Sequence, residues 1–262
     1  MSVNRETAMA ELPRVTTTML DSGVAHVQLS RPDKLNALDR LMFAGLIDAA
    51  AQLAGSGEVR CVVLSGEGRG FSAGIDLSMF ADLPQGKGSL TARSHGRSNF
   101  YQQAAMAWRD LPVPVIAAVH GVCFGGGLQI AAAADIRIVA PDARLAVMEM
   151  KWGIVPDMGH FALWRGIVRE DHLRELTYTA REFSGEEALR LGFASHLDAD
   201  PLACALALAG EIAGKDPAAI RAAKSLFNQA PDMTQDQVLI AESAAQEPLL
   251  AAKLSAMQRT ER

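Results

Sequence analysis

The sequence predicts an α/β protein in which ββα units form a spiral, followed by a helical C-terminal region. Two strand-like runs and one helix-like segment alternate about three times before residue 195, and such a loose repeat indicates units wound around shared sheets. The residues after that point form Ala-rich helical segments without strand runs. Apolar residues make up 49% of the chain and charged residues 21%, a balance typical of a globular protein with a sizeable core.

The 262 residues predict one main domain with an appendage. We expect residues 1–12 to form a flexible tail, residues 13–195 the core, and residues 196–262 a helical oligomerisation region. A helix with an apolar stripe and no sheet of its own must pack on the core or on a neighbouring subunit. We therefore expect an oligomer.

The first elements are predicted by strand composition and turn residues. A hairpin is expected over Val15–Leu20 and Val24–Leu29, because Asp-Ser-Gly between β-rich runs is a turn signal. Apolar residues recur with a helical period over Leu38–Leu53. A continuous apolar run predicts a strand at Val59–Leu64.

The middle of the chain repeats this order. Residues 89–110 predict a helix and Pro112–Val119 a buried strand. The glycine-rich GVCFGGG then precedes an apolar helix, Leu128–Ala134, and two strands follow at Ile136–Val139 and Leu145–Met150. Four C-terminal helices are expected at Pro201–Gly214, Pro217–Gln229, Gln235–Ala245 and Pro248–Arg259.

Composition argues against several classes of function. The formal net charge of −5 argues against a nucleic-acid-binding protein, which normally has a basic balance. Three cysteines without a CxxC motif or a Cys/His cluster indicate reduced thiols rather than a disulfide scaffold or a metal site. The chain has no apolar run of signal-peptide or membrane-spanning length. We expect a cytoplasmic protein that binds neither membranes nor metal ions.

One serine lies in a pattern typical of hydrolases. GFSAG at residues 70–74 matches the Gly-x-Ser-x-Gly nucleophile elbow, which makes Ser72 a candidate nucleophile. The elbow places its serine directly after a strand, whereas here residues 65–69 separate the predicted strand from the motif. The candidate triad partners, none in a distinctive context, are Asp157 with His160, His172 or His196. A serine that only hydrogen-bonds locally is favoured over a nucleophile.

Two glycine-rich turns each connect an apolar strand to a helical segment. Gly125–Gly127 lies just before a helix, where backbone N–H groups are unpaired and the helix dipole favours negative charge. Ala73-Gly74-Ile75 likewise precedes a short helical run, Asp76–Phe80. Brought together, two such turns would direct two N–H donors at one oxygen and form an oxyanion hole. The alternative is that the glycines only allow tight turns, and the spacing favours neither interpretation.

Five segments together resemble one known family. They are RPDKLNALD, GRGFSAGIDLSMF, AAVHGVCFGGGLQIAAAADIRIVAPDARLAV, MEMKWGIVPDMG and FSGEEALRLGFASHL. In this order, from about residue 15 to residue 230, they resemble the crotonase (enoyl-CoA hydratase/isomerase) superfamily. The resemblance implies a spiral ββα core, C-terminal helices used in a homotrimer or dimer of trimers, and a coenzyme A thioester as the substrate. It implies no metal or redox cofactor.

The resemblance assigns binding roles to individual positions. Ile75 and Gly126 match the family's two oxyanion-hole donors, whose backbone N–H groups hold the enolate formed when a proton moves next to the thioester. Leu35 and Ala73 match positions where the backbone meets the adenine end of coenzyme A. Lys34 lies near the expected path of the phosphates, although an ordinary solvated lysine fits that position equally well.

The acid–base positions depart from the hydratase pattern of the family. Family hydratases carry two glutamates; Glu149 matches the second, but Gln129 stands at the first, and an amide cannot transfer a proton. Asp157 stands where hydratases usually have glycine, and it resembles a proton carrier of the dienoyl-CoA isomerases. Those isomerases also have an acidic residue at the Gln129 position, so the match is partial. The alternative for Asp157 is a helix N-cap beside Pro156.

Glu149 is the strongest candidate for proton transfer. Its neighbours are apolar, and burial would be costly without a task while raising the pKa of the carboxyl group toward neutrality. A glutamate facing solvent at a strand end is the alternative. We therefore expect double-bond isomerisation of an unsaturated acyl-CoA. The remaining alternatives are hydration, a serine hydrolase using Ser72, and a non-catalytic acyl-CoA-binding protein.

Overall fold

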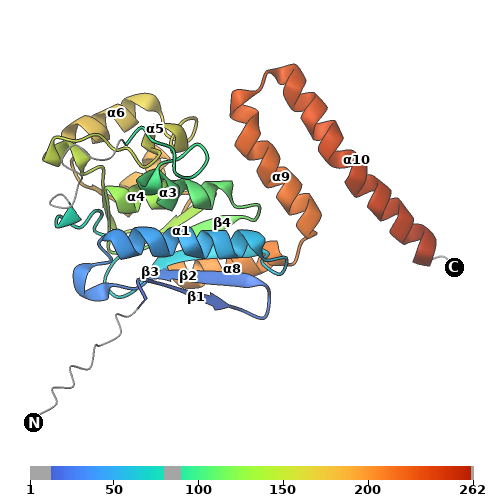
Figure 1. The fold of residues 1–262 in the computed structure, drawn as a ribbon, viewed down its shortest axis with the longest axis horizontal. Helices are drawn as coiled ribbons and strands as arrows, with labels where there is room; N and C mark the ends of the chain where they lie inside the picture. Colours follow the sequence, from blue (N-terminus) through green and yellow to red (C-terminus); the bar gives the residue numbers. More distant parts are fainter. Residues whose placement is uncertain (1–12, 80–89, 261–262) are drawn as a thin grey trace, which may run out of the picture.

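The computed structural model describes residues 13–79 and 90–260, which form two sheets covered by helices (Figure 1). The larger sheet has six strands in the order β1-β2-β3-β4-β6-β9. Their bounds are Val15–Met19, Val24–Leu29, Cys61–Gly66, Val115–Val119, Ile136–Val139 and His196–Leu197. The smaller sheet has the order β5-β7-β8, with bounds Val122–Phe124, Arg144–Ala146 and Phe183–Ser184.

The strand pairing explains how the chain moves between the two sheets. β1 and β2 form the expected antiparallel hairpin, with Val15 opposite Leu29, whereas β2, β3, β4, β6 and β9 pair in parallel. Consecutive strands β4 and β5 lie in different sheets, as do β6 and β7. Helix α4 (Gly126–Ala132) follows β5, so strand, strand and helix succeed one another as the sequence predicts.

Two amphipathic helices cover one face of the larger sheet. Helix α1 (Arg40–Gly55) begins at Asp39, whose carboxylate accepts the Met42 backbone N–H at 2.8 Å, a standard N-cap. Helix α3 (Phe100–Asp110) begins at a capping box formed by Asn99 and Gln102. It therefore starts later than the predicted 89–110, of which residue 89 lies outside the described residues.

The core continues on both faces of the central strands, because every residue of β3 and β4 is buried. Helix α8 (Pro201–Ala213) covers the second face, where its Ala205 and Ala209 pack against side chains such as Val63 and Ile116. Small side chains let a helix approach the sheet closely. α8 falls within the range 196–262 that we expected to form the oligomerisation region, yet it is part of the body.

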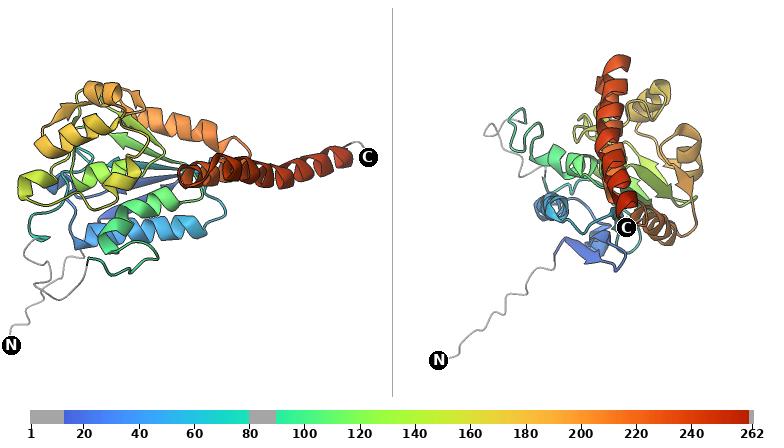
Figure 2. Two further views of the ribbon diagram at one scale, coloured as in Figure 1. Left: turned by 90° about the horizontal axis from the view of Figure 1, so that it is seen from above. Right: turned by 90° about the vertical axis from the view of Figure 1, so that its right-hand side faces the viewer.

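The last two helices lie outside this body (Figures 1 and 2). Helix α9 (Pro217–Gln229) lies beside α10 (Gln235–Thr260), which extends away from the sheets. The prediction of separate helices at Gln235–Ala245 and Pro248–Arg259 was wrong, because α10 runs through Pro248 without a break. No helix among residues 13–79 and 90–260 is long and apolar enough to cross a membrane.

The remaining elements are short. The 3₁₀ turns span Pro32–Lys34, Glu149–Trp152 and Ala230–Asp232, and α5, α6 and α7 span His160–Leu163, Glu170–Thr179 and Gly185–Leu191. The predicted strand Leu145–Met150 was wrong from Val147 onward. β7 ends at Ala146, and the chain enters the 3₁₀ turn at Glu149. Of the helical run expected at Asp76–Phe80, Phe80 lies outside the described residues.

Candidate functional site

A cavity of about 470 Å³ opens between four segments of the body. Its lining comes from residues 34–37, 73–77, 124–129 and 148–158, and it is mostly apolar with a few polar groups. Such a lining is typical of a small-molecule site, in which apolar contacts supply burial and polar groups fix orientation. All three candidate acid–base residues and both candidate oxyanion donors line this one cavity.

The two glycine-rich turns meet at the cavity because glycine permits a close approach. Gly74 has φ of +87°, and a Cβ there would lie 2.7 Å from the Phe124 carbonyl oxygen and 3.6 Å from the Gly126 nitrogen. Any side chain at this position would therefore push the turns apart. A parallel bridge between Ser72 and Cys123 also joins the two segments.

Each turn has a backbone N–H group that the hydrogen bonds around it leave for a ligand. Leu38 donates to the Gly74 carbonyl at 2.8 Å and accepts from the Asp76 N–H at 3.0 Å. These two bonds place the intervening Ile75 N–H on the side away from Leu38. Gly126 is the first residue of α4, so its N–H has no acceptor within its own helix. Ile75 and Gly126 both line the cavity, so the turns that carry the two predicted donors meet at one site.

Ser72 braces this arrangement rather than facing the cavity. Its hydroxyl donates to the Asn36 carbonyl at 2.9 Å and accepts from the Gly74 N–H at 3.2 Å. The residue is completely buried, and it is not among the residues that line the cavity. Among the described residues, neither hydrogen-bond partner of its hydroxyl is a histidine, and His160 bonds to Thr177 instead. A hydroxyl committed in this way is not an activated nucleophile.

Gln129 connects the two candidate carboxylate segments. Its Nε2 donates to Glu149 Oε1 at 2.6 Å, and its Oε1 accepts the Met158 backbone N–H at 2.8 Å. A backbone N–H can only donate, so this bond fixes which end of the amide faces Glu149. Gln129 therefore fixes the position of Glu149 relative to the segment that follows Asp157.

Glu149 has the environment of a proton carrier. Only 8% of its surface is exposed, so the solvent-facing alternative was wrong, and its Oε2 has no hydrogen-bond partner among the described residues. Burial raises the pKa of the Glu149 carboxyl group, the hydrogen bond from Gln129 opposes that rise, and the charge of Asp157 adds to it. A raised pKa suits a group that must accept and release a proton near neutral pH.

Asp157 lies on the same cavity and does not cap a helix. The next helix, α5, begins at His160 after Gly159 and has no side-chain cap, so the N-cap alternative was wrong. Asp157 is an exposed residue, but the protein atoms around its carboxyl group remove part of its hydration and raise its pKa. The cavity thus has two carboxylates, Glu149 and Asp157, on the segment 148–158.

The predicted coenzyme-binding positions lie at one side of the cavity. Lys34 is exposed, and both Lys34 and Ala73 line the cavity. Leu35 does not line it; its backbone carbonyl accepts the Ala73 N–H at 2.8 Å. Leu35 therefore supports the turn that carries Ala73, from a left-handed conformation with φ of +49°.

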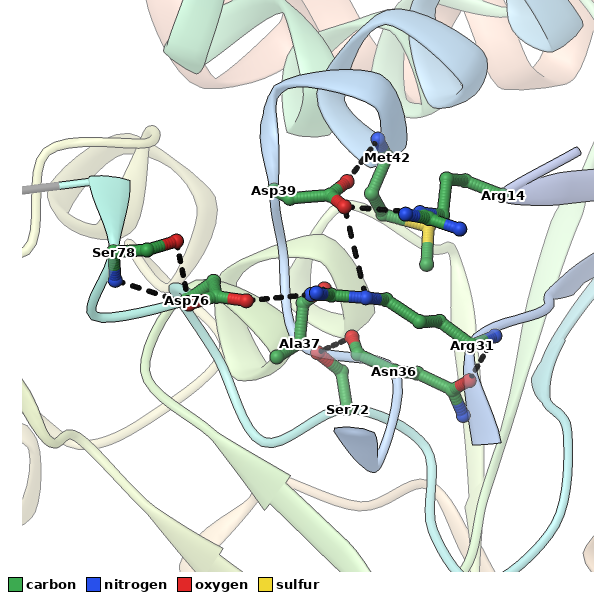
Figure 3. A network of polar contacts seen from close by, with 9 residues as sticks. All are labelled: Arg14, Arg31, Asn36, Ala37, Asp39, Met42, Ser72, Asp76 and Ser78. Atoms are coloured by element: carbon green, nitrogen blue, oxygen red, sulfur yellow. Dashed lines mark hydrogen bonds and ion pairs between the residues drawn. The ribbon is translucent and has the colours of Figure 1, made fainter. Parts of the chain in front are cut away.

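A group of charged residues beside the cavity was not predicted (Figure 3). Arg31 pairs with Asp76 at 2.7 Å and lies 3.6 Å from Asp39, which also pairs with Arg14 at 2.9 Å. Hydrogen bonds from Ser78 and Arg31 lower the pKa of Asp76 to about 2. Charged residues flanking a glycine turn were a possible signal, but pairing across 45 residues needs the fold.

Known proteins share this fold and much of this sequence. The human mitochondrial Δ(3,5)-Δ(2,4)-dienoyl-CoA isomerase is 38% identical over 216 residues, covering 79% of this chain and 66% of its own length. A candidate enoyl-CoA hydratase from Streptomyces coelicolor A3(2) superposes with a TM-score of 0.85 at 31% identity, covering 99% of this chain and 98% of its own. A candidate enoyl-CoA hydratase from Thermobifida fusca YX, solved with acetoacetyl-CoA, superposes with a TM-score of 0.79 at 32% identity. The match covers 92% of this chain and 96% of that one.

The two-sheet α/β fold with paired glycine turns on one cavity is that of the crotonase superfamily. The family model for enoyl-CoA hydratase/isomerase matches residues 20–259. The chain belongs to the enoyl-CoA hydratase/isomerase family.

Proposed function

We propose that the protein moves a carbon–carbon double bond in an unsaturated acyl-CoA thioester. The observation that carries this proposal is the placement of Glu149 and Asp157 on the same cavity as the Ile75 and Gly126 N–H groups. The human relative, by its name a dienoyl-CoA isomerase, is consistent with it. Because the chain covers only 66% of that relative's length, the activity is proposed from this chain's own site.

The reaction follows from the position of each group. The Ile75 and Gly126 N–H groups bind the thioester oxygen, so negative charge that develops there is stabilised. Glu149 removes a proton from the carbon next to the thioester carbonyl, and the electron pair of that C–H bond moves toward the oxygen to give the enolate. The enolate then takes a proton at another carbon, which Glu149 supplies when the carbons are close and Asp157 supplies when they are distant. The substrate neither gains nor loses atoms.

Hydration is the second candidate within the family, and Gln129 disfavours it. Adding water requires one group to remove a proton from water and another to deliver one to carbon. The Gln129 amide, at the position of the hydratases' first glutamate, can orient water but cannot exchange a proton. A non-catalytic acyl-CoA-binding protein would keep thioester affinity without turnover of any substrate.

The coenzyme and the assembly complete the proposal. We assign Lys34 to the coenzyme A phosphates, and Ala73 with the backbone of Leu35 to the adenine. The assembly is a trimer or a dimer of trimers held by the C-terminal helices, and the location is the cytoplasm. These assignments rest on the family resemblance, on the lining of the cavity, and on the exposed apolar side chains of α9 and α10.

The test is the Asp157→Asn variant, which keeps the shape of the side chain and removes its proton transfer. We expect isomerisation of a 3,5-dienoyl-CoA to fall by about 100-fold, within the 10²–10⁴ range of general acid–base catalysis. Isomerisation of a simple 3-enoyl-CoA should fall only a few-fold, because Glu149 reaches both carbons. Both rates are measured as kcat, with release of free coenzyme A followed as a control for hydrolysis. Small, equal losses on both substrates would leave Glu149 as the sole proton carrier.

A further inference from the structure

Arg31 lies where the two segments on the oxyanion side of the cavity come together (Figure 3). Its guanidinium Nη1 donates to the Ala37 carbonyl at 3.1 Å and to Asp76 Oδ2 at 2.7 Å. Ala37 and Asp76 both line the cavity. Only 14% of the Arg31 side chain is exposed, so these bonds are partly shielded from competing water.

Asp76 directly follows Ile75, whose N–H faces the cavity. On its other side, the Asp76 carboxylate accepts from the Ser78 N–H at 3.0 Å and from the Ser78 hydroxyl at 2.8 Å. Gly74 before Ile75 has φ of +87°, and glycine has wide conformational freedom. The Gly74 carbonyl and the Ile75 N–H belong to one planar peptide unit, and the Leu38 N–H holds that carbonyl at 2.8 Å while the Leu38 carbonyl accepts the Asp76 N–H at 3.0 Å. The direction of the Ile75 N–H therefore depends on how closely residues 37–38 and 74–76 stay aligned.

We propose that Arg31 is a positioning residue for the oxyanion hole: by holding the Ala37 carbonyl and the Asp76 carboxylate together, it keeps residues 37–38 aligned with residues 74–76 and so maintains the direction of the Ile75 N–H. This inference rests on the proposed function, since it needs the Ile75 N–H to bind a thioester oxygen. Arg31 acts by holding these groups in place and not by attracting the negative charge of the thioester oxygen. Arg31 faces the carboxylates of Asp76 and Asp39, which together offset its positive charge.

The electrostatics give this role a distinct signature. Asp76 has a pKa of about 2, lowered mainly by the Ser78 N–H and then by Arg31, so the ion pair persists across the neutral range. Loss of Arg31 should therefore lower kcat without moving the pH dependence that Glu149 imposes. A general loss of structure would instead weaken the binding of every ligand.

The experiment compares two ligands that differ at the thioester. Calorimetry gives Kd for acetoacetyl-CoA, which presents a thioester carbonyl, and for coenzyme A, which has none. For Arg31→Met we expect acetoacetyl-CoA to bind at least 10-fold more weakly, coenzyme A to change less than 2-fold, and isomerase kcat to fall about 10- to 100-fold. Arg31→Lys retains the positive charge but cannot reproduce the guanidinium geometry that bonds both Ala37 and Asp76. Its affinity for acetoacetyl-CoA and its kcat should therefore lie between those of the unmodified protein and Arg31→Met.

Arg14→Met is the matched control, because Arg14 pairs with the same Asp39 oxygen at 2.9 Å, whereas Arg31 is the arginine that pairs with Asp76. It should change neither ligand more than 2-fold. Should Arg31→Met fail to fold, Asp76→Asn removes the same ion pair and should give the same selective loss. If the Arg31 and Asp76 variants still prefer acetoacetyl-CoA over coenzyme A as strongly as the unmodified protein does, the role of Arg31 is overturned but the proposed function stands. Equal binding of both ligands by the unmodified protein would overturn the oxyanion hole itself, and the inference with it.

Discussion

The hydrogen bonds of Gln129 determine which oxygen of Glu149 carries the proton. Oε1 accepts the Gln129 amide at 2.6 Å, so its lone pair on that side is occupied and a proton there would face a donor. Oε2 has no partner among the described residues. The migrating proton therefore belongs on Oε2. Gln129 holds the carboxylate in one orientation while its own bond to Met158 fixes the amide.

Replacing Glu149 with glutamine should abolish isomerisation while leaving the protein folded. The expected loss in kcat is at least the 10²–10⁴-fold of general acid–base catalysis, because no other carboxylate on the cavity occupies its position. Purified Glu149→Gln, assayed with 3-enoyl- and 3,5-dienoyl-CoA, measures this. Substantial residual turnover of the 3-enoyl substrate would show that Asp157 can act alone.

The raised pKa of Glu149 also predicts how activity and stability depend on pH. Activity needs the ionised base, so kcat/KM should fall as the pH drops through a pKa above the value of about 4.3 of an exposed glutamate. The folded pKa exceeds the unfolded one, so the Glu149 contribution to stability is full below the unfolded pKa and is lost as the pH rises through the folded pKa. At neutral pH, Glu149→Gln should therefore melt at the same temperature or higher. A lower melting temperature would mean that the ionised side chain is stabilising.

The missing second carboxylate gives a gain-of-function prediction. Crotonyl-CoA hydration by the unmodified protein should be slow, and Gln129→Glu should raise it, by up to the roughly 10²–10⁴-fold of an added acid–base group. The Met158 N–H, 2.8 Å from Gln129 Oε1, can bind the new carboxylate. Gln129→Met, which adds no acid or base, is the control and should not hydrate faster. Fast hydration by the unmodified protein would mean that Glu149 handles both proton transfers.

Local sequence predicted some properties of individual residues. The apolar neighbours of Glu149 predicted its burial, which the structure shows. The glycine turns alone left the oxyanion hole open, and the family resemblance assigned its donors to Ile75 and Gly126, which both line the cavity. The Arg31–Asp76 pair was not predicted, because any of several arginines could meet a given aspartate until the fold brings them together. The alternative role of Asp157, as a helix N-cap, was wrong because the next helix, α5, begins three residues later, at His160.

At the scale of elements, a substitution at Gly126, the first residue of α4, tests whether the backbone N–H there belongs to the oxyanion hole. Proline is tolerated at the first position of a helix, so Gly126→Pro removes the N–H donor from a position where the fold permits it. Turnover should fall about 10²–10³-fold, the cost of losing one such donor. The measurement is kcat on any accepted thioester, with the melting temperature as a check on folding.

Gly126→Ala is the matched control for this substitution. A Cβ there would meet Leu38 Cδ1 at 2.8 Å and Met158 Sδ at 3.0 Å, contacts that proline shares, but alanine keeps the N–H. Any activity lost by proline beyond that lost by alanine therefore reports the donor. Equal activities in the two folded variants would remove Gly126 from the oxyanion hole.

The elements that the sequence predicted least well are those set by tertiary partners. The apolar run Leu145–Met150 has the composition of a strand, but β7 pairs with β5 and β8 only over residues 144–146. Beyond them the chain turns, and this turn carries Glu149 to the cavity. The hairpin and α1 were predicted correctly because a turn signal and a helical period act locally.

At the scale of the whole molecule, the body and the last two helices are held together by few polar contacts. Lys224 of α9 is buried and donates to the Val113 carbonyl at 2.8 Å and to Asp135 at 2.9 Å. Arg165 bonds Asp232 at the turn between α9 and α10. With the bonds from Arg221 to the Val59 carbonyl and from Asn228 to the Arg109 carbonyl, these contacts hold α9 to the body along its length, whereas α10 packs mainly on α9. Composition predicted helices here, but not how little of them the body would cover.

The exposed surface of these helices is the basis of the last prediction. Large apolar side chains are unusually exposed there: Phe227 (76%), Ile240 (69%) and Leu254 (59%), with Leu239, Leu250 and Met257 also exposed. An exposed apolar surface of this kind promotes aggregation of a monomer in water, and it normally marks an interface. We expect three copies to bury it, so the protein should sediment at three or six times the mass of one chain.

The double variant Ile240→Asp, Leu254→Asp should shift this assembly toward monomers, because each buried charge in an interface lacks a partner. Leu41→Asp is the control: Leu41 is similarly exposed, at 48%, but it lies on α1 of the body. Sedimentation velocity at several concentrations measures the assembly, and circular dichroism measures folding. If the unmodified protein sediments as a monomer at micromolar concentrations, α9 and α10 do not form the proposed interface. If only the control dissociates, the interface lies on the body instead.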